Sequence, residues 1–285
     1  MLDILLDAVI DSIKILPFLF LAYLAMEWLE NRESAKTVRM IKKSGRFGPV
    51  IGGALGILPQ CGFSAAAANL YAGRVITVGT LLAVFLSTSD EMLPILLSET
   101  ANGLSAVVIV KILALKACIG VLVGLLVDLA VRKNQINGDG LHIHDLCEHD
   151  HCHCEKGILY SALMHTIQMI VFIFAVTLAL GALIYLVGED TISGLILNRP
   201  VLSELLAGLV GLIPNCAASV VLTQLYVQGA MGGGAMMAGL FVSAGVGILV
   251  LCRTNHHPKE NMWIISLLYI SGVTAGMLVS ALGCL

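Results

Sequence analysis

The sequence predicts an all-α polytopic membrane protein, an inverted repeat of two five-element halves with broken, hairpin-like helices at Pro59–Cys61 and Pro214–Cys216. Three observations lead to this fold class. The chain has 285 residues, of which 58% are hydrophobic and only 12% are charged. Its apolar residues gather in long runs. Two of these runs are interrupted at a proline, and the two interrupted runs match each other residue by residue.

The composition excludes several classes of protein. A soluble domain carries about 25% charged residues, so this chain lacks the polar side chains to cover a water-facing surface, and lipid must be its solvent. Runs of about 20 apolar residues have the length that a helix needs to cross roughly 30 Å of hydrocarbon. A transmembrane β-barrel would instead show alternating segments of about ten residues. The net charge of -3 argues against a nucleic-acid partner.

Hydropathy divides the chain into eight apolar segments. The second and the sixth are each broken near the middle, where a proline is followed at once by a primary amide and a cysteine. Proline removes a backbone donor and clashes with the preceding turn, so we expect each of these segments to be two half-helices joined by a turn. The segments are residues 5–29, 48–72, 75–98, 104–131, 158–187, 201–228, 230–252 and 263–284.

The two broken segments are diverged copies of one unit. At an offset of 155 residues, Pro59 and Cys61 coincide with Pro214 and Cys216, and Leu70-Tyr71 coincides with Leu225-Tyr226. Chance seldom places such identities in one ungapped register. The chain therefore divides into a first membrane repeat at 1–131, a cytoplasmic His/Cys-rich linker at 132–157 and a second membrane repeat at 158–285.

Lys and Arg residues in short loops indicate the orientation of the chain in the membrane. Basic residues fill the linker at 30–47, and further pairs are Arg132 with Lys133 and Arg253 with Lys259. These three regions all reach the cytoplasm only if each broken segment enters and leaves on one side. Each half then has an odd number of membrane elements, so the halves are inverted. We expect a multi-pass protein of the cytoplasmic (inner) membrane. We expect no cleavable signal peptide, because the acidic start lacks the basic region of one.

The two proline turns are the first candidate site. Transporters with inverted repeats bind substrate near the bilayer midplane, at broken helices whose backbone groups face the substrate. The turns supply amides, thiols and hydroxyls in matching positions, which favours a pseudo-symmetric substrate site. The alternative is that they only shape the fold, with cysteine as a small apolar filler. The candidate substrate-binding residues here are Gln60, Cys61, Ser64, Asn215, Cys216 and Ser219.

Asp90 and Glu91 extend this candidate site, because they stand inside the third apolar segment. Ionisable residues at membrane depth are costly and usually face a cavity or a partner. A carboxylate here is suited to bind a cation or carry a proton. The alternative is a structural ion pair with Lys111 or Lys116 of the next segment. These lysines, of which Lys116 is the deeper, are also candidates for coupling or charge relay.

A further set of candidates for coupling or charge relay lies in the first segment and its copy. Asp7, Asp11 and Lys14 are spaced so that they share one helix face. The copy carries His165, and imidazole is the side chain suited to carry protons under physiological conditions. The alternative is an interfacial start of the helix, with Lys14 snorkelling to the surface.

The linker contains a metal-binding composition. Thirteen residues hold five of the eight histidines and three of the eight cysteines, and imidazole with thiolate suits Zn, Cu, Ni and Co. The alternative is a polar linker with incidental affinity. We expect no required cofactor, although this loop is suited to bind a transition metal. Its candidate ligands are His142, His144, Cys147, His149, His151, Cys152, His153 and Cys154.

Several stretches carry a family resemblance. They are Asp11 to Glu27, Gly45–Pro49, Pro59–Arg74, Ser87–Met92 and Pro214–Ser219. These stretches look like those of the ten-transmembrane heavy-metal exporters, whose members carry labels such as manganese transporter or arsenic efflux protein. The resemblance covers nearly the whole chain and implies a ten-element membrane topology and efflux of a metal or metalloid.

These features predict a secondary transporter that exports a heavy-metal or metalloid ion across the cytoplasmic membrane, with proton coupling through Asp90 or Glu91. No phosphate-binding loop supports ATP drive. One alternative is a transporter of an organic or oxyanion substrate, with Lys14, Lys111 or Lys116 as counter-charges. A weaker one is an intramembrane thiol redox protein. We expect no enzymatic activity. The expected partners are the lipid bilayer and a small inorganic ion or solute, and a homo-oligomer is left open.

Overall fold

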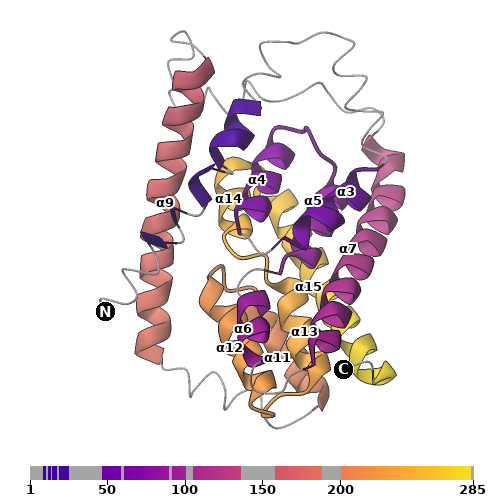
Figure 1. Cartoon of the computed structure of the whole chain (residues 1–285). Helices are drawn as coiled ribbons and strands as arrows, with labels where there is room; N and C mark the ends of the chain where they lie inside the picture. Colours follow the sequence, from indigo (N-terminus) through magenta and orange to yellow (C-terminus); the bar gives the residue numbers. More distant parts are fainter. Residues whose placement is uncertain are drawn as a thin grey trace.

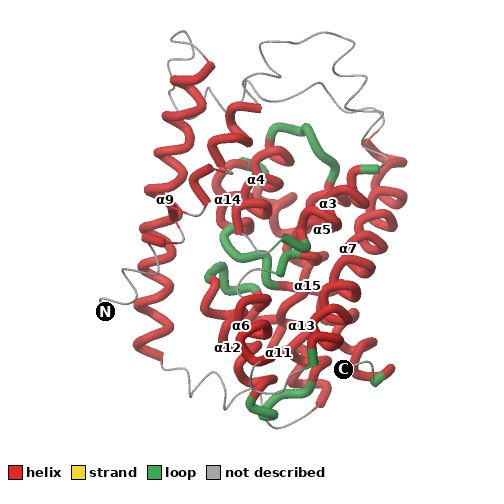
Figure 2. Tube along the Cα trace, viewed as in Figure 1, coloured by secondary structure: helices red, strands yellow, loops and turns green. Residues whose placement is uncertain are grey.

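The computed structural model is all-helical in the part of the chain that it describes, which confirms the class of a helical polytopic membrane protein (Figures 1 and 2). Five helical segments in that part are long and apolar enough to cross a membrane. The structure describes residues 9–10, 12–13, 15–17, 19–25, 47–58, 61–89, 92–100, 105–135, 158–187 and 200–283.

Helix labels follow Figure 1. A short apolar helix also covers Ile15–Ala25, apart from one residue that is not described. The labelled helices are, in chain order, α3 (Gly48–Gly56), α4 (Cys61–Ala72), α5 (Val78–Ser87), α6 (Met92–Glu99), α7 (Ala106–Gln135), α9 (Ile158–Val187), α11 (Pro200–Gly211), α12 (Cys216–Val227), α13 (Gly233–Val242), α14 (Gly247–Thr254) and α15 (Pro258–Leu282).

The two proline-containing segments are indeed each divided into two short helices. Helices α3 and α4 flank the first turn, and α11 and α12 flank the second. Both arms of the first pair lie in the upper half of the molecule in Figure 1, and both arms of the second pair lie in the lower half. This is the arrangement that hairpins entering from opposite sides would give.

The third and seventh apolar segments are also divided, which the sequence analysis did not anticipate. The third segment forms α5 and α6, and the seventh forms α13 and α14. The break after α13 contains Gly245 with a φ of 52°, a left-handed conformation that glycine adopts without steric cost. Each of α4, α5 and α6 begins and ends 155 residues before α12, α13 and α14 respectively, so the breaks belong to the repeated unit.

Helix packing repeats in the same way. Helix α3 packs on α5 and α7, and α11 packs on α13 and α15. The two halves are joined reciprocally, because α4 packs on α14 while α12 packs on α6. Exchanging the halves therefore leaves this set of contacts unchanged, as a two-fold pseudo-symmetry requires.

Close contacts at glycine show the same duplication at atomic scale. A Cβ atom on Gly56 would lie 2.9 Å from the carbonyl oxygen of Val84, and one on Gly211 would lie 2.2 Å from that of Gly239. Gly56 and Val84 precede Gly211 and Gly239 by the same 155 residues. Glycine is needed at both places because the neighbouring helix brings its backbone against the position of the missing side chain.

The helices of the two halves run in opposite directions. In Figure 1, α7 rises from the lower end to the upper end, and α15 descends from the upper end to the C-terminus below. Arg74 follows the end of α4, and Arg253 and Lys259 flank the α14–α15 turn. We call the end of the molecule that contains these two turns the basic end. This arrangement is consistent with the predicted inverted repeat and with one side of the membrane receiving the basic loops.

The broken helices form the centre of the molecule. Of the most apolar 18-residue stretch in each segment, 75% is buried in α5–α6 and 89% in α13–α14. The corresponding shares are 22% in α7, 33% in α9 and 39% in α15. Long apolar side chains such as Val110, Leu122 and Leu129 point outward from α7. The unbroken helices thus present one face to lipid and shield the irregular backbone, which is tolerated at membrane depth only inside protein or beside water.

Candidate functional site

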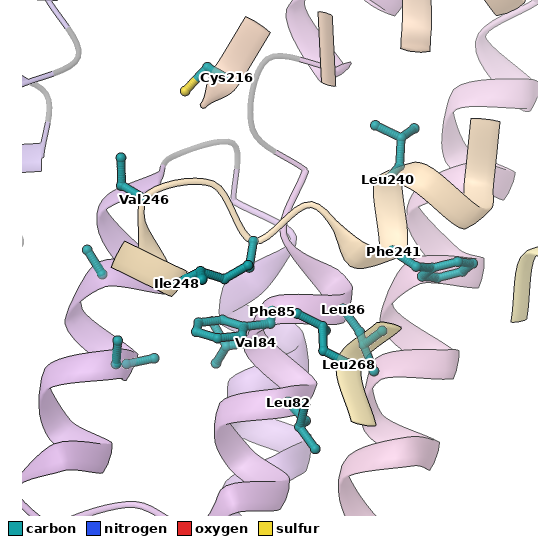
Figure 3. Close-up of a cluster of buried hydrophobic side chains, with 14 of the residues drawn as sticks. Leu82, Val84, Phe85, Leu86, Cys216, Leu240, Phe241, Val246, Ile248 and Leu268 are labelled. Atoms are coloured by element: carbon teal, nitrogen blue, oxygen red, sulfur yellow. The ribbon is translucent and has the colours of Figure 1, made fainter. Parts of the chain in front are cut away.

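Four interruptions of helical backbone form the candidate site. They fall after α3, α5, α11 and α13, at residues 57–60, 88–91, 212–215 and 243–246. Each leaves the carbonyl groups of one helix end and the N–H groups of the next without partners inside the helix. Figure 3 shows the last interruption running between Leu240 and Val246, with Phe85 of α5 packed beneath Ile248 of α14.

Side-chain hydroxyls donate to backbone carbonyl groups around the first two interruptions. Ser87 donates to the carbonyl oxygen of Ala83 at 2.7 Å, and Thr88 donates to that of Val84 at 2.7 Å. Ser89 donates to the carbonyl oxygen of Ile57 at 2.6 Å. The last bond ties the turn of the first hairpin to the break between α5 and α6.

The second hairpin turn is held by Asn215. Its side-chain oxygen accepts a hydrogen bond from the backbone N–H of Ala217 at 3.2 Å, so it caps the start of α12. Ser219 donates to the carbonyl oxygen of Cys216 at 2.8 Å. Asn215 and Cys216 are 6% and 7% exposed. The first residue of α12 is therefore a buried thiol at the positive end of a half-helix.

Ser243 stands at the end of α13, beside the fourth interruption. It is buried, and its hydroxyl has no hydrogen-bond partner. Thr88, its copy in the first repeat, instead donates to its own helix. An unsatisfied buried hydroxyl costs about 1–3 kcal/mol, so this group is available for a bound ion, solute or water.

Two contacts between the repeats close the centre. A Cβ on Gly247, the first residue of α14, would lie 2.9 Å from the Cβ of Ser64 on α4. On the other side, Lys116 of α7 is 1% exposed and donates to the carbonyl oxygen of Leu240 at the end of α13. A cation at the negative end of a helix is favourable. The ammonium group also lies 5.5 Å from the ring centroid of Phe241.

The structure brings together part of the predicted site. Ser64, Asn215, Cys216 and Ser219 are buried around the interruptions. Cys61 begins α4, but its side chain is among those not described. Gln60, Asp90 and Glu91 lie outside the described residues.

The candidates for charge relay are distributed over several places. Lys111 is exposed on α7, unlike Lys116. His165 is 4% exposed on α9, and its ring stacks on that of Tyr23 with 5.3 Å between the centroids. Asp7, Asp11 and Lys14 lie outside the described residues.

The predicted metal-binding loop belongs to the part of the chain that the structure does not describe. His142, His144, Cys147, His149, His151, Cys152, His153 and Cys154 all lie outside the described residues. Within the described part of the chain, no group of three or more His, Cys, Asp or Glu side chains is arranged to hold a metal ion.

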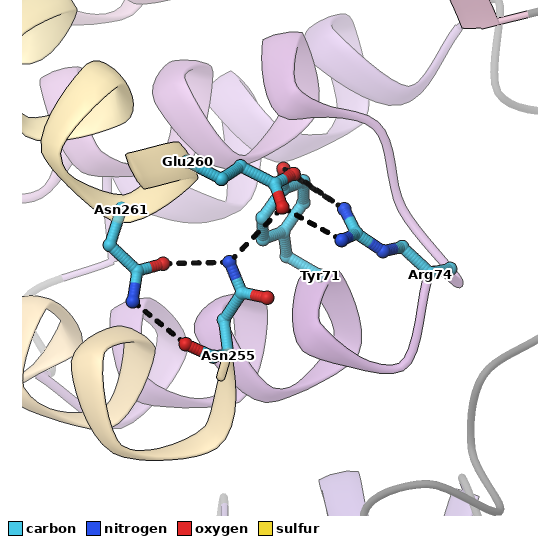
Figure 4. A network of polar contacts seen from close by, with 5 residues as sticks. All are labelled: Tyr71, Arg74, Asn255, Glu260 and Asn261. Atoms are coloured by element: carbon cyan, nitrogen blue, oxygen red, sulfur yellow. Dashed lines mark hydrogen bonds and ion pairs between the residues drawn. The ribbon is translucent and has the colours of Figure 1, made fainter. Parts of the chain in front are cut away.

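A polar network joins the two repeats at the basic end (Figure 4). Arg74 makes two bonds to the carboxylate of Glu260, at 2.6 and 2.8 Å, and Tyr71 donates to the same carboxylate. Asn255 donates to Glu260 at 3.5 Å and to Asn261 at 2.6 Å. Hydrogen bonding to Glu260 raises the pKa of Arg74 above its ordinary value. The network connects the end of α4 with the α14–α15 turn.

The opposite end lacks this pairing among the equivalent residues. The copy of Arg74 is Gly229, and the copy of Glu260 is Ser105. The turns themselves are alike, because Arg74 and Gly229 both adopt positive φ, at 58° and 71°. Arginine at such a position is unusual, so the sequence keeps a strained residue where its side chain forms the ion pair.

The sequence analysis missed several residues that the structure singles out. Asn69 is fully buried and neither polar atom of its side chain has a hydrogen-bond partner, and one carboxylate oxygen of the 5% exposed Glu204 is also unpartnered. Glu204 carried a usable signal, because it is the only acidic residue in the segment 201–228. Asn69, Ser243 and the Arg74–Glu260 pair became recognisable only once the helices were placed.

Comparison with known proteins gives one match. The model of a family described as "Putative, 10TM heavy-metal exporter" matches residues 1–185 and, a second time, residues 158–284. No curated protein and no solved structure is detectably similar to the chain.

Proposed function

Because this chain belongs to the family of ten-transmembrane heavy-metal exporters, we propose that it is a secondary transporter that moves a heavy-metal or metalloid ion out of the cell across the cytoplasmic membrane. The observation that carries this proposal is the group of four helix interruptions at the centre, with the buried Asn215 and Cys216 at one of them. Unwound backbone and half-helix ends at mid-depth are typical of substrate sites in inverted-repeat transporters.

The two cysteines give the site its preference for soft ions. Cys61 and Cys216 are the first residues of α4 and α12, and thiolate ligands favour soft metals and metalloids over magnesium or calcium. The proposed ligand set also includes an amide and a hydroxyl from each repeat. These are Gln60 and Ser64 in the first repeat, and Asn215 and Ser219 in the second. Asp90 and Glu91 supply the negative charge that a cation requires and are candidates for proton coupling.

Alternating access follows from the way the halves are joined. The Arg74–Glu260 network closes the basic end between α4 and the α14–α15 turn, so opening toward the cytoplasm requires these bonds to break. The copies of the pair at the other end are uncharged. Opening the basic end therefore costs more free energy than opening the other end. The transport cycle then has a preferred resting state, in which the basic end is closed.

An oxyanion or organic anion is the second candidate substrate. Lys116 places a buried positive charge beside the α13–α14 interruption, and helix N-termini such as that of α12 favour anions. This observation makes a comparison of anions with cations part of the test.

The test is uptake into everted membrane vesicles that contain the protein. The panel is Mn²⁺, Zn²⁺, Cu⁺, arsenite and a small organic anion, and vesicles without the protein are the control. We expect uptake of a soft metal or metalloid that collapses when the proton gradient is dissipated. Uptake of the organic anion alone would overturn the metal assignment, and no uptake of any solute above the control would contradict transport.

The metal-binding linker has a separate proposed role. We expect residues 142–154 to bind transition metal on the cytoplasmic side and to be dispensable for folding. Deleting them should reduce metal bound to the purified protein without reducing the amount of protein in the membrane. Loss of folded protein on deletion would show that the linker is structural.

A further inference from the structure

A groove runs between the two arms of the first hairpin, in the upper half of the molecule in Figure 1. It has a volume of about 270 Å³ and is partly open to the surroundings. Helices α3 and α4 form its walls, and α5 forms its floor, because both arms pack on α5. Its lining includes Ile51 and Leu55 of α3, Phe63 and Leu70 of α4, and Thr80 and Val84 of α5.

The lining side chains offer a polar ligand little to bind. Among the described lining residues, only Thr77 and Thr80 carry polar side chains. Their hydroxyls bond to each other at 2.8 Å, and Thr77 also donates to Asp128 of α7 at 2.7 Å. Both hydroxyl hydrogens are therefore already used. An ion or a polar solute would lose its hydration here without gaining side-chain ligands, so the groove suits an apolar ligand.

The mouth of the groove faces outward from α3. Ile51 and Leu55 line the groove and are also 56% and 44% exposed. On the other wall, Phe63 and Leu70 are partly exposed. The surrounding segment, residues 48–72, is one of the long apolar runs for which lipid is the solvent. The groove therefore opens into the hydrocarbon of the membrane.

The groove also has the direction of a lipid tail. It begins beside the turn that contains Val75 and Ile76, at the basic end, and reaches Leu55 and Phe63 beside the first central interruption. The seven-residue rise from Gly48 to Leu55 is about 10 Å. A lipid tail of the leaflet at that end covers roughly 15 Å between the surface and the midplane, half of the hydrocarbon thickness. A tail can thus lie in the groove along most of its length.

The second repeat uses a side chain of its own at the equivalent place. The copies of Ala67 and Val84 are Leu222 and Gly239. Leu222 is fully buried, and its Cδ1 atom would lie 2.4 Å from a Cβ on Gly239. It therefore extends from the hairpin arm across the floor helix. Alanine at position 67 cannot do this, and Phe63, whose copy is Ala218, lines the remaining space without closing it.

We propose that the groove binds one acyl chain of a phospholipid from the leaflet at the basic end. An empty groove would lose dispersion contacts along its walls, and apolar cavities do not fill with water. Even a cavity of about 150 Å³ lined by apolar side chains binds benzene. At this depth the abundant apolar ligand is the lipid tail. The bound chain completes the packing between the two arms, and its binding does not depend on which ion the protein moves.

The test uses phosphatidylglycerol with a diazirine on one acyl chain, mixed into phosphatidylethanolamine vesicles that contain the full-length protein. The protein is irradiated either in the vesicles or after purification in detergent, and adducts are located by peptide mass spectrometry. We expect adducts at residues 48–55 and 63–70 to persist after purification, whereas adducts on the outward face of α7, at Val110, Leu122 and Leu129, are lost. Equal loss at both places would overturn the proposal. So would the absence of adducts in the groove, the result expected if another segment of the chain fills it.

Variants at the mouth test the same site independently. Ala66 lines the groove and is partly exposed, so Ala66→Phe should block the mouth and lose most of the retained adduct. Val110→Phe adds the same ring at a 65% exposed position of α7 and should retain the groove adduct fully. Ala66→Val, which copies Val221 of the second repeat, is the milder change and serves if the phenylalanine variant does not fold. It should retain less adduct than the wild type, and unchanged retention in the folded variants would contradict a lipid chain in this groove.

Discussion

At the scale of single residues, the position of Arg74 shows how the repeat was adapted at one end. The turns that follow α4 and α12 have the same backbone hydrogen bond. The N–H of Val75 donates to the carbonyl oxygen of Leu70, and the N–H of Ala230 donates to that of Leu225, both at 2.9 Å. This six-to-one bond is the mark of a Schellman turn, which needs a left-handed residue. One repeat uses Gly229 there and the other uses Arg74.

Replacing Arg74 separates the turn from the ion pair. Arg74→Ala and Arg74→Gly both lose the bonds to Glu260, whose side chain is 25% exposed. Only glycine relieves the left-handed strain, which is worth about 1 kcal/mol. We therefore expect a higher Tm for Arg74→Gly than for Arg74→Ala in detergent, with both below the wild type. Equal Tm values for the two variants would contradict strain at this residue.

The two lysines of α7 form a matched pair for a second prediction. Lys116 is buried and bonded to the carbonyl group of Leu240, whereas Lys111 is exposed. Lys116→Met leaves that carbonyl without its donor, at a cost of about 1–3 kcal/mol. Lys111→Met should change stability by less than about 0.5 kcal/mol. The comparison is made by thermal unfolding, and a larger effect at Lys111 would show that the burial of Lys116 is not stabilised in this way.

At the scale of helices, glycine at the contact explains why α11 and α13 pack so close to each other. Gly211 faces the backbone of Gly239, whereas a Cβ on Gly232 would meet nothing within 4 Å. Gly211→Ala must push α11 away from α13, and overpacking of this kind costs about 1–3 kcal/mol. Gly232→Ala is the control and should leave Tm almost unchanged. A tolerated Gly211→Ala would mean that the two helices are free to separate.

The sequence predicted the elements unevenly, for a physical reason. The breaks at Pro59 and Pro214 were predictable because proline cannot continue a helix hydrogen-bond pattern. The breaks after α5 and α13 have no proline within them, and their segments are apolar on both sides, so hydropathy alone merges the two short helices into one span. The second of these breaks contains Gly245, which the structure shows in a left-handed conformation. In the sequence it is simply one glycine within an apolar segment.

Contacts between distant segments could not be predicted from local patterns. Ser64 and Cys216 were candidates because the repeats match there, and both are buried. Their role in binding stays a prediction. Arg74 and Glu260 lie 186 residues apart, and neither has a copy in the other repeat that would have drawn attention to it. Their pairing depends on how the two halves are joined, which only the structure gives.

At the scale of the whole molecule, the reciprocal joining of the halves is the central property. Helix α4 packs on α14 and α12 packs on α6, so neither half buries its own broken helices alone. The duplicated contacts and the opposite directions of α7 and α15 in Figure 1 are consistent with an inverted repeat. An ion bound at the centre would contact both halves and would sense their relative movement.

The most direct test of this account is transport by Cys216→Ser in everted vesicles, measured with the ion that the wild-type protein accumulates. Cys118→Ser is the matched control, because Cys118 is an exposed thiol on α7. We predict that Cys216→Ser abolishes uptake at wild-type amounts of protein in the membrane, while Cys118→Ser transports normally. Wild-type uptake by Cys216→Ser would contradict a substrate site at the central interruptions.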